Sequence, residues 1–316
     1  MTKIEGLYTA LITPFNEAGA FDEEGFRNLL RMQIAAGVDG IMVLGTTGES
    51  PTLTRSEKER AVVIAREETR GKVAFMVGAG SYSTQQTIEN VRWSEEYGAE
   101  SVLIVTPYYN RPTQEGIFLH FKAVSEAARV PVIVYNHQGR TGQNISTETL
   151  LRIAKLPNIC GVKDSSGQLQ QMMDVIDQIK RGNPDFCVMS GVDLLTMPNM
   201  AMGGDGVISV VSNMVPVQMK QLTAAMQRRD LDHARHLHYA LLPIFNASEV
   251  ETNPIPIKAT MSALGLPAGT PRLPLCNLTS QNEKKLHHTL ADPKVKQLLD
   301  VNCALYRQCA EPAMTR

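Results

Sequence analysis

The feature that most constrains the fold of this chain is an alternation of short apolar segments with segments of helical periodicity. The apolar segments recur about every 30 residues through the first two-thirds of the sequence, a spacing typical of repeated β-strand and α-helix units. Eight of them are predicted strands, at 7–15, 40–44, 73–80, 101–107, 132–136, 159–163, 186–190 and 206–210. The helical segments that follow them are 22–36, 55–69, 84–97, 114–128, 146–154, 169–180, 194–202 and 216–228.

Strands this apolar are typical of a parallel sheet, because parallel strands are covered on both faces. Eight such units predict an α/β protein with a closed (β/α)8 TIM barrel. An open doubly wound sheet is the alternative, but the first strand lacks the Gly-x-Gly-x-x-Gly turn of a dinucleotide-binding half. Later apolar patterns, at 231–247, 255–264 and 281–302, are helical only. We therefore predict a catalytic barrel over 1–228, a C-terminal helical bundle over 229–302 and a loosely ordered tail over 303–316.

Composition argues against several classes of function. The chain has 31 Lys and Arg against 32 Asp and Glu, with no charged block, so nucleic acid and membrane surfaces are not expected partners. No apolar run is long enough for a bilayer, and the first residues do not resemble a signal peptide, so a cytoplasmic location is expected. Five cysteines without CxxC spacing make a disulfide framework or zinc site improbable. A small-molecule ligand is the simplest expectation.

Lys163 ends a predicted strand that is followed by the polar sequence Asp-Ser-Ser-Gly. Such a position brings a lysine from the strand to a loop. If its surroundings are apolar, desolvation lowers the pKa of the amine, and the neutral amine can attack a carbonyl to form a Schiff base. The alternative is a solvated surface lysine, which is the commoner fate of a strand-end lysine.

Other polar residues gather after neighbouring strands, where a barrel of this type carries its chemistry. Residues 45–50, Gly-Thr-Thr-Gly-Glu-Ser, offer hydroxyls and backbone N–H groups suited to a carboxylate, although an ordinary turn also fits them. Segments 106–112 and 135–142 add tyrosines that can relay protons and an arginine that can hold a carboxylate with two hydrogen bonds. For each tyrosine, half-buried packing with a solvated hydroxyl is the alternative.

These motifs, in this order, resemble the dihydrodipicolinate synthase and N-acetylneuraminate lyase family of class I pyruvate aldolases. The resemblance rests on 45–50, 107–112, 135–136 with 139–142, and 161–164, and it extends through 190–191, 203–209 and 253–258 to nearly the whole chain except the tail. It implies a (β/α)8 barrel with a C-terminal helical bundle and no metal or organic cofactor. It also implies a homotetramer built as a dimer of dimers, with a dimer as the alternative.

Within this family, Arg140 and the tyrosine pair 108–109 are most similar to members that condense pyruvate with L-aspartate 4-semialdehyde to 4-hydroxy-tetrahydrodipicolinate. That reaction belongs to diaminopimelate and lysine biosynthesis. The resemblance implies that Lys163 forms a covalent imine with pyruvate and that Tyr135 is the nearest acid/base group. The remaining implied roles are a hydroxyl relay through Thr46 to Tyr109 of a neighbouring subunit, pyruvate binding by Thr47, Gly191 and Ile208, and semialdehyde binding by Arg140.

Two departures from the family pattern bear on the substrate. His137-Gln138 stands where Val-Pro is common and affects the loop that carries Arg140, and Asp164-Ser165-Ser166 replaces a Glu-Ala-Ser type sequence. The alternatives are an N-acetylneuraminate lyase or 2-oxo-3-deoxy sugar acid aldolase and, remotely, a 2-oxo-acid-binding module without turnover. Arg140 favours the synthase, because a sugar-cleaving site presents uncharged polar groups to hydroxyls. His137 itself is most simply a surface loop residue.

The resemblance also bears on feedback inhibition. Members inhibited by lysine hold it with an asparagine and a glutamate after the third strand, and here Tyr82 and Gln86 take those places. Arg55 and Lys58 replace the expected histidines. Two cations repel the ammonium group of lysine, and a glutamine cannot pair with it, so weak or absent lysine inhibition is expected.

Overall fold

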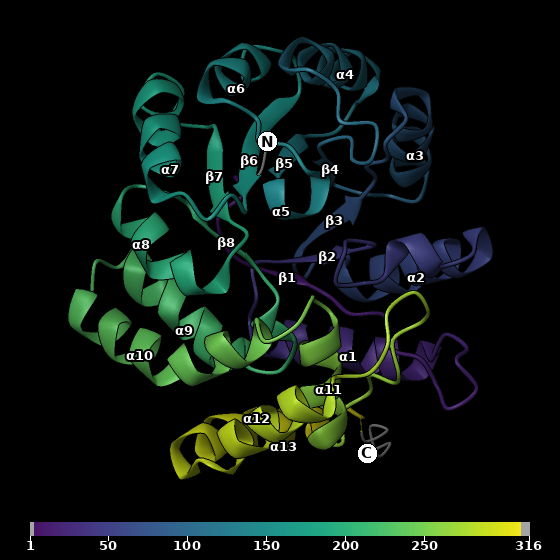
Figure 1. Ribbon diagram of the computed structural model, residues 1–316, viewed down its shortest axis with the longest axis vertical. Helices are drawn as coiled ribbons and strands as arrows, with labels where there is room; N and C mark the ends of the chain where they lie inside the picture. Colours follow the sequence, from purple (N-terminus) through teal and green to yellow (C-terminus); the bar gives the residue numbers. More distant parts are fainter. Residues whose placement is uncertain (1–2, 311–316) are drawn as a thin grey trace.

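The computed structural model describes residues 3–310, and within them eight parallel strands close into a barrel. Each strand pairs with the next in sequence, and β8 pairs with β1 to complete the ring. The predicted (β/α)8 barrel is confirmed (Figure 1). The strands are β1 (Gly6–Ala10), β2 (Gly40–Val43), β3 (Ala74–Gly78), β4 (Ser101–Val105), β5 (Val132–Asn136), β6 (Ile159–Asp164), β7 (Cys187–Ser190) and β8 (Gly206–Ser209).

Helices surround the barrel and continue beyond it. Among the described residues, nine α-helices lie in the barrel part: α1 (Glu23–Ala35), α2 (Arg55–Thr69), α3 (Thr84–Glu96), α4 (Gln114–Ala127), α5 (Gln138–Thr141), α6 (Thr147–Ile153), α7 (Leu169–Val175), α8 (Thr196–Ala201) and α9 (Pro216–Gln227). Four follow: α10 (Leu231–Ser248), α11 (Ile255–Ala263), α12 (Ser280–Ala291) and α13 (Pro293–Ala310). Several begin with a capping side chain, as at Thr54, which forms a capping box with Glu57 at the start of α2.

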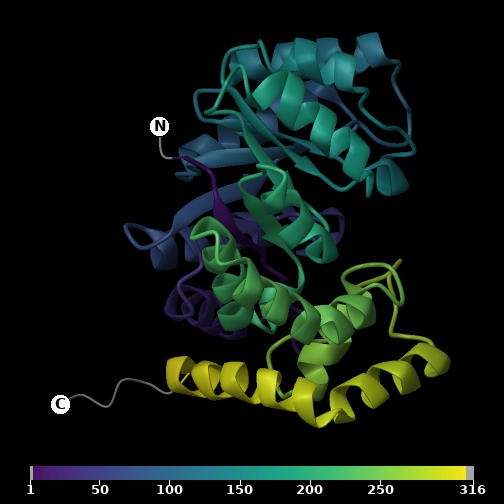
Figure 2. The same ribbon diagram turned by 90° about the vertical axis from the view of Figure 1, so that its left-hand side faces the viewer.

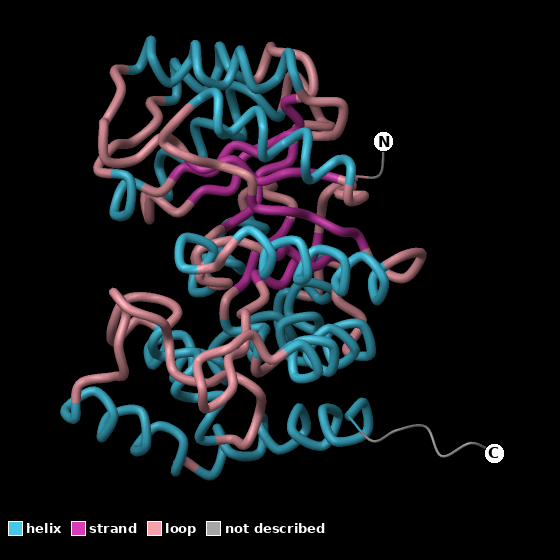
Figure 3. Tube along the Cα trace, turned by 90° about the vertical axis from the view of Figure 1, so that its right-hand side faces the viewer, coloured by secondary structure: helices cyan, strands magenta, loops and turns pink. Residues whose placement is uncertain are grey.

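The strands form the centre of the molecule because both of their faces are apolar (Figure 3). Side chains that point into the barrel make one buried cluster, and those that point outward pack against the helices in a larger one. The inner cluster includes Tyr8, Met42, Met76, Leu103, Ile133, Tyr135, Met189 and Ile208. The barrel interior is therefore filled with side chains, so a ligand must bind above this layer, at the mouth.

The first predicted strand, 7–15, is too long, because β1 ends at Ala10. Residues 11–15 are nonetheless buried, and the Phe15 N–H donates to the carbonyl of Ala268 at 3.0 Å. The apolar run therefore continues past the strand, and the C-terminal part contacts its end at Phe15. This contact is between residues far apart in sequence.

The C-terminal helices lie across one end of the molecule, with α12 and α13 forming its lower edge in Figure 2. The helical pattern predicted over 281–302 is two helices, because Pro293 opens α13 where α12 has ended. The predicted tail boundary at 303 is wrong. Helix α13 continues to Ala310, with Cys303 buried and Tyr306 packed against the core, and only residues 311–316 of the predicted tail lie outside the described residues.

Within residues 3–310, none of the helices combines the length and apolar character needed to cross a membrane.

Candidate active site

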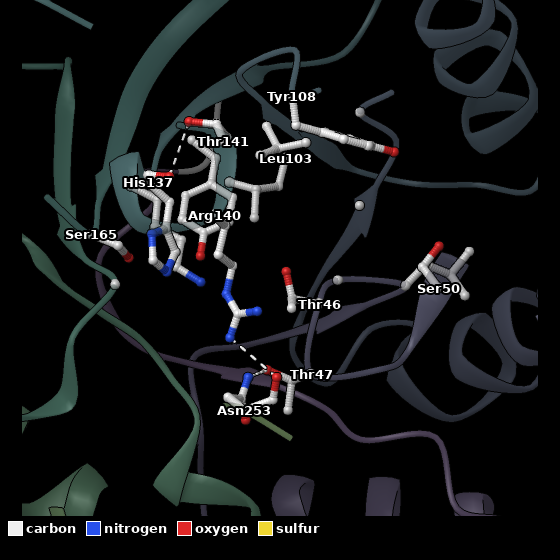
Figure 4. A pocket seen from close by; sticks show the side chains of 18 of the residues that line it. Thr46, Thr47, Ser50, Leu103, Tyr108, His137, Arg140, Thr141, Ser165 and Asn253 are labelled. Carbon is white, nitrogen blue, oxygen red and sulfur yellow. Dashed lines mark hydrogen bonds between the residues drawn. The ribbon is translucent and has the colours of Figure 1, made fainter. Parts of the chain in front are cut away.

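A cavity of about 970 Å³ opens at the carboxyl ends of the strands. Its walls come from the segments after β2, β3, β4, β5, β6 and β7, together with residues 249–253, which follow α10. Figure 4 shows part of this wall, with Arg140, Thr46 and His137 around the open centre. The location agrees with the rule that barrels of this type carry their chemistry where the strands end.

Lys163 lies at the base of this cavity and is 4% exposed. It pairs in register with Tyr135 on β5, and its Nζ lies 4.5 Å from the centre of the tyrosine ring. Burial lowers the pKa of Lys163 to about 8, with Asp193 raising it and Arg140 lowering it further. At neutral pH about one lysine in ten then carries a neutral amine, roughly 300 times the fraction in water. This amine is suited to attack a carbonyl.

Tyr135 is the buried hydroxyl beside that amine. Burial raises the pKa of the Tyr135 phenol, while the neighbouring Ser165 hydroxyl and the charge of Arg140 oppose the rise. A phenol whose pKa is raised keeps its proton at neutral pH, so it can donate that proton to an oxygen that develops charge. Lys163 and Tyr135, predicted to act together, are neighbours in the structure, and their joint catalytic role stays a prediction.

The loop after β2 brings Thr46 and Thr47 to the cavity. The Thr47 Oγ1 accepts a hydrogen bond of 2.9 Å from Asn253 Nδ2, and Figure 4 shows the Thr46 hydroxyl directed toward the centre. Asn253 lies beyond the barrel in sequence and was not among the predicted site residues. Its contact means that the C-terminal part helps to position a loop of the site.

A buried ion pair fixes the same loop from below. The Glu49 Oε1 lies 2.7 Å from Lys258 Nζ, and both side chains are 0% exposed. Lys258 also donates to the carbonyl of Thr13 at 3.2 Å, and the other Glu49 oxygen accepts from the Arg272 N–H at 2.8 Å. Glu49 has a φ of 50°, in the left-handed region, which costs free energy unless contacts such as these hold it.

Arg140 lies in α5, a single helical turn after β5. The carbonyl of His137 accepts from the N–H groups of Arg140 and Thr141, and Arg140 Nη2 donates to the carbonyl of Asn253 at 3.1 Å (Figure 4). No carboxylate of residues 3–310 forms an ion pair with Arg140. Its charge is available to a ligand. Gln138 replaces proline at little cost, because the first helical residue needs no N–H donor.

His137 lines the cavity, so the surface-loop interpretation of this residue is wrong. Its ring centre lies 5.8 Å from that of Tyr135, nearly edge to face. Burial, Arg140 and Lys163 lower the pKa of His137 to about 4, so the imidazole is neutral at physiological pH. A neutral ring adds no positive charge beside the Lys163 amine.

Two predicted site residues, Tyr109 and Ile208, do not line the cavity. Tyr109 is 90% exposed and does not line the cavity of its own chain, whereas Tyr108 lines it and is half-buried. Ile208 packs in the inner barrel cluster and is not among the cavity residues. Gly191 does line the cavity, and a β-carbon there would stand 2.0 Å from Ser165 Oγ and 2.7 Å from Lys163 Cε, so only glycine leaves space for both side chains.

Asp193 is a residue that the sequence did not single out. It is 6% exposed, and its Oδ2 accepts from the N–H groups of Val210 at 3.0 Å and Val211 at 3.1 Å. Its Oδ1 has no hydrogen-bond partner in residues 3–310. Because Asp193 raises the pKa of Lys163, it is the carboxylate whose charge favours a cation at the lysine nitrogen.

The cavity also extends toward α2 and α3, where Arg55, Lys58, Gln86 and Trp93 line it. Arg55 lies 4.2 Å from the Trp93 ring centre and pairs with Glu59 at 3.0 Å. Burial and the charge of Arg55 lower the pKa of Lys58. Tyr82 is half-exposed and does not line the cavity. Two cations thus face this extension, in line with the residue types behind the prediction of weak lysine inhibition.

A buried lysine of lowered pKa, at the end of a (β/α)8 barrel strand and beside a tyrosine, defines a class I aldolase arrangement, in which a Schiff base activates the substrate. Comparison with known proteins narrows this class. Residues 3–292 match the Dihydrodipicolinate synthetase family, and the chain belongs to that family.

Individual relatives agree with the family match. The 4-hydroxy-tetrahydrodipicolinate synthase of Protochlamydia amoebophila (strain UWE25) is 53% identical over 287 residues, which are 91% of this chain and 96% of the relative. The crystal structure of dihydrodipicolinate synthase from Thermotoga maritima superposes with a TM-score of 0.90 at 42% identity and covers 94% of this chain and 100% of that one. A variant described as the first monomeric dihydrodipicolinate synthase has a TM-score of 0.88 at 40% identity and covers 95% and 97%. The family predicted from the motifs is confirmed.

Proposed function

We propose that this chain condenses pyruvate with L-aspartate 4-semialdehyde to 4-hydroxy-tetrahydrodipicolinate, a step of diaminopimelate and lysine biosynthesis. It is a lyase of the class I aldolase type. The observation that carries the proposal is the Lys163 amine, buried beside Tyr135 with a pKa of about 8, below an arginine that has no carboxylate partner in residues 3–310. The choice of reaction is supported by similar proteins that are named synthases and that match this chain over most of their length.

In the first step, the neutral Lys163 amine attacks the keto carbon of pyruvate. The carbinolamine that forms loses its hydroxyl as water, which requires a proton donor at that oxygen. The protonated Tyr135 phenol lies beside the amine and can supply the proton. The resulting iminium cation is stabilised by Asp193, whose buried charge favours a positive nitrogen at Lys163.

In the second step, the iminium withdraws electrons, and the pyruvate methyl carbon loses a proton to form an enamine. The enamine carbon then attacks the aldehyde carbon of the semialdehyde, and the new alkoxide takes up a proton. Hydroxyls suit these transfers because Thr and Tyr both donate and accept protons without a fixed charge. Thr46 is proposed as a member of this relay because its hydroxyl faces the cavity (Figure 4).

Binding roles follow from the available donors. Thr47, held by Asn253, and the backbone beside it are proposed to bind the pyruvate carboxylate, with Gly191 leaving room for it. Ile208 is proposed to support the pocket from the inner cluster rather than to line it. Arg140 is proposed to hold the carboxylate of the semialdehyde, because an arginine fork binds a carboxylate with two parallel hydrogen bonds.

The assembly belongs to the same proposal. Tyr109 is almost fully exposed and does not line the cavity of its own chain, so we propose that it completes the relay of a neighbouring subunit. A homotetramer built as a dimer of dimers, or a dimer, would supply such a neighbour, whereas one similar protein is described as a monomeric variant. Catalysis without metal or organic cofactor and a cytoplasmic location stay predictions.

The proposal is tested by comparing turnover of pyruvate with aspartate semialdehyde, with N-acetylmannosamine and with glyceraldehyde. A preference for the semialdehyde by orders of magnitude is expected. Preference for a sugar aldehyde would overturn the assigned substrate while leaving the Schiff base intact.

Borohydride reduction with pyruvate, followed by peptide mapping, is expected to label Lys163. For the relay, Tyr109→Phe protein mixed with Lys163→Ala protein should regain part of the activity, and no regain would place the whole site in one chain.

A further inference from the structure

Ser165 is a hydroxyl of the active site to which the proposed function gives no role. It follows β6 directly, two residues after Lys163, and its backbone N–H donates to the carbonyl of Asn136 at 2.8 Å. Because alternate residues of an extended segment point to the same side, Ser165 and Lys163 both reach the cavity, whereas Asp164 between them does not line it.

The Ser165 hydroxyl is buried and lacks a hydrogen-bond partner within residues 3–310. The residue is 9% exposed, and its Oγ makes no hydrogen bond of good geometry within residues 3–310. An unsatisfied buried hydroxyl costs free energy unless a ligand or water forms a hydrogen bond with it. A group that faces the cavity in this state is suited to bind something that enters the cavity.

The position of this hydroxyl relative to the reacting groups is well defined. A β-carbon on Gly191 would meet both the Ser165 Oγ and the end of the Lys163 side chain, so these two are close neighbours. The hydroxyl also lies near enough to the Tyr135 phenol to lower its pKa. Ser165 therefore neighbours both the Tyr135 proton donor and the Lys163 side chain.

Resting on the proposed function, we propose that Ser165 is a further catalytic residue, which passes the proton of Tyr135 to the oxygen that leaves the carbinolamine. The lone pair of Nζ forms the C=N bond as the C–O bond breaks. The departing oxygen takes the Ser165 proton and leaves as water, and Ser165 Oγ takes the proton of Tyr135. The phenolate left behind recovers a proton when the pyruvate methyl carbon gives one up to form the enamine.

The relay explains why the position carries a hydroxyl. Serine has one O–H donor and two acceptor lone pairs, so it can accept from Tyr135 and donate to the departing oxygen at the same moment. Ser166 is the natural comparison. Its Oγ donates to Asp164 Oδ1 at 2.6 Å and is therefore already engaged, although it is the adjacent residue.

The test measures imine formation without any aldehyde. Ser165→Ala is expected to slow both borohydride-dependent capture of pyruvate on Lys163 and exchange of the pyruvate methyl protons in heavy water by about 100-fold or more, in the range of general acid catalysis. Ser165→Thr, which keeps the hydroxyl, should retain most of the rate. Ser166→Ala should stay within about two-fold of the native protein, so it controls for local disturbance.

The outcomes separate this role from the function itself. Capture and exchange at native rates in folded Ser165→Ala protein would overturn the relay, with circular dichroism verifying the fold. Equal slowing of Ser165→Ala and Ser165→Thr would also overturn it, because the hydroxyl would not be the cause. If the native protein forms no borohydride-stable adduct with pyruvate, the proposed function fails instead.

Discussion

Two fully buried lysines in this chain have opposite surroundings. Lys258 is paired with Glu49 at 2.7 Å and also donates to the Thr13 carbonyl, so its positive charge is neutralised by an adjacent carboxylate. Lys163 has no ion pair in the described part of the chain, and it lies above an aromatic ring at the base of a cavity. Burial lowers the pKa of both amines, but only Lys258 has a carboxylate close enough to hold its proton. The comparison shows that burial alone does not make a lysine reactive, whereas burial without a partner does.

The sharpest way to test this contrast is to remove the reactive amine. Lys163→Met is expected to abolish the pyruvate adduct and to lower kcat/KM by on the order of 10⁴-fold or more, because the covalent route is lost. Turnover assays and mass spectrometry after borohydride reduction measure both effects. An adduct that persists on another lysine would contradict the assignment.

The same variant should make the protein more stable. The folded pKa of about 8 lies below the ordinary 10.5, so the folded state binds its proton less well than the unfolded state. Burial of the charged Lys163 amine therefore lowers the stability of the folded state. This loss is fully present below pH 8, amounts to about 3 kcal/mol at neutral pH and vanishes above pH 10.5. Lys163→Met should therefore raise Tm at pH 7 and remove part of the rise of stability between pH 8 and 10.5. Unchanged stability in a denaturant titration would show that Lys163 is not desolvated.

Lys258→Met should have the opposite effect on stability. It leaves Glu49 buried without its cation, which costs about 3–5 kcal/mol, and it loosens the loop that carries Thr46 and Thr47. The double variant Lys258→Met/Glu49→Gln is the matched control, because it removes both charges and should recover much of the loss. Thermal unfolding measures the difference, and equal stability of the single and double variants would refute the pairing argument.

Arg140→Met is expected to raise KM for the semialdehyde by about 10- to 100-fold, as loss of a charged hydrogen bond implies, while pyruvate capture is retained. Because Arg140 lowers the pKa of Lys163, the midpoint of capture against pH should move above 8. Steady-state kinetics and the pH profile measure these separately. If the variant weakened the binding of pyruvate as much as that of the semialdehyde, Arg140 would have a structural role instead.

Asp193→Asn tests the other neighbouring charge. Asp193 raises the pKa of Lys163, so its neutral replacement should move the midpoint of pyruvate capture below pH 8, opposite to Arg140→Met. The iminium loses its counter-charge, and kcat should fall about ten-fold, equivalent to about 1.4 kcal/mol. Capture rates followed across pH 6 to 10 decide the direction, and a shift to higher pH would contradict it.

The smallest expected effect is inhibition of turnover by free L-lysine added to the assay. With Arg55 and Lys58 facing the extension of the cavity, half-inhibition is expected only above about 1 mM, if it occurs. An inhibition curve with submillimolar half-inhibition would refute this. Such a result would also mean that the ammonium group of lysine can bind in spite of the positive charges of Arg55 and Lys58.

Sequence reasoning succeeded where one local pattern determined the structure. The strands were found because their apolar runs match the period of a covered parallel sheet, and Lys163 and Tyr135 were found together because each follows such a run. It failed where burial came from distant residues. Residues 11–15 are apolar and buried like a strand, but they bond to distant segments, Ile12 to Asn213 and Phe15 to Ala268. The pairing of Lys258 with Glu49 joins positions 209 residues apart.

The site shows the same limit. The loops that carry Thr47 and Arg140 were identified, but Asn253, which touches both, belongs to the C-terminal part and has no local signal for this role. Asp193 likewise depends on backbone N–H groups of the strand β8 region. Lysine, tyrosine and arginine are recognisable by their chemistry, whereas the residues that position them are recognisable only after folding.

The helical turn α5 has a consequence for altering the specificity of this protein. Its hydrogen bonds close on the carbonyl of His137, so the segment that carries Arg140 is stabilised within itself. Lys163 and Tyr135 line the cavity from other segments. Residues 137–142 can therefore be replaced as one segment by a library of aldehyde-binding loops, on a barrel that keeps Lys163 and Tyr135 and in which each new loop also sets the pKa of Lys163.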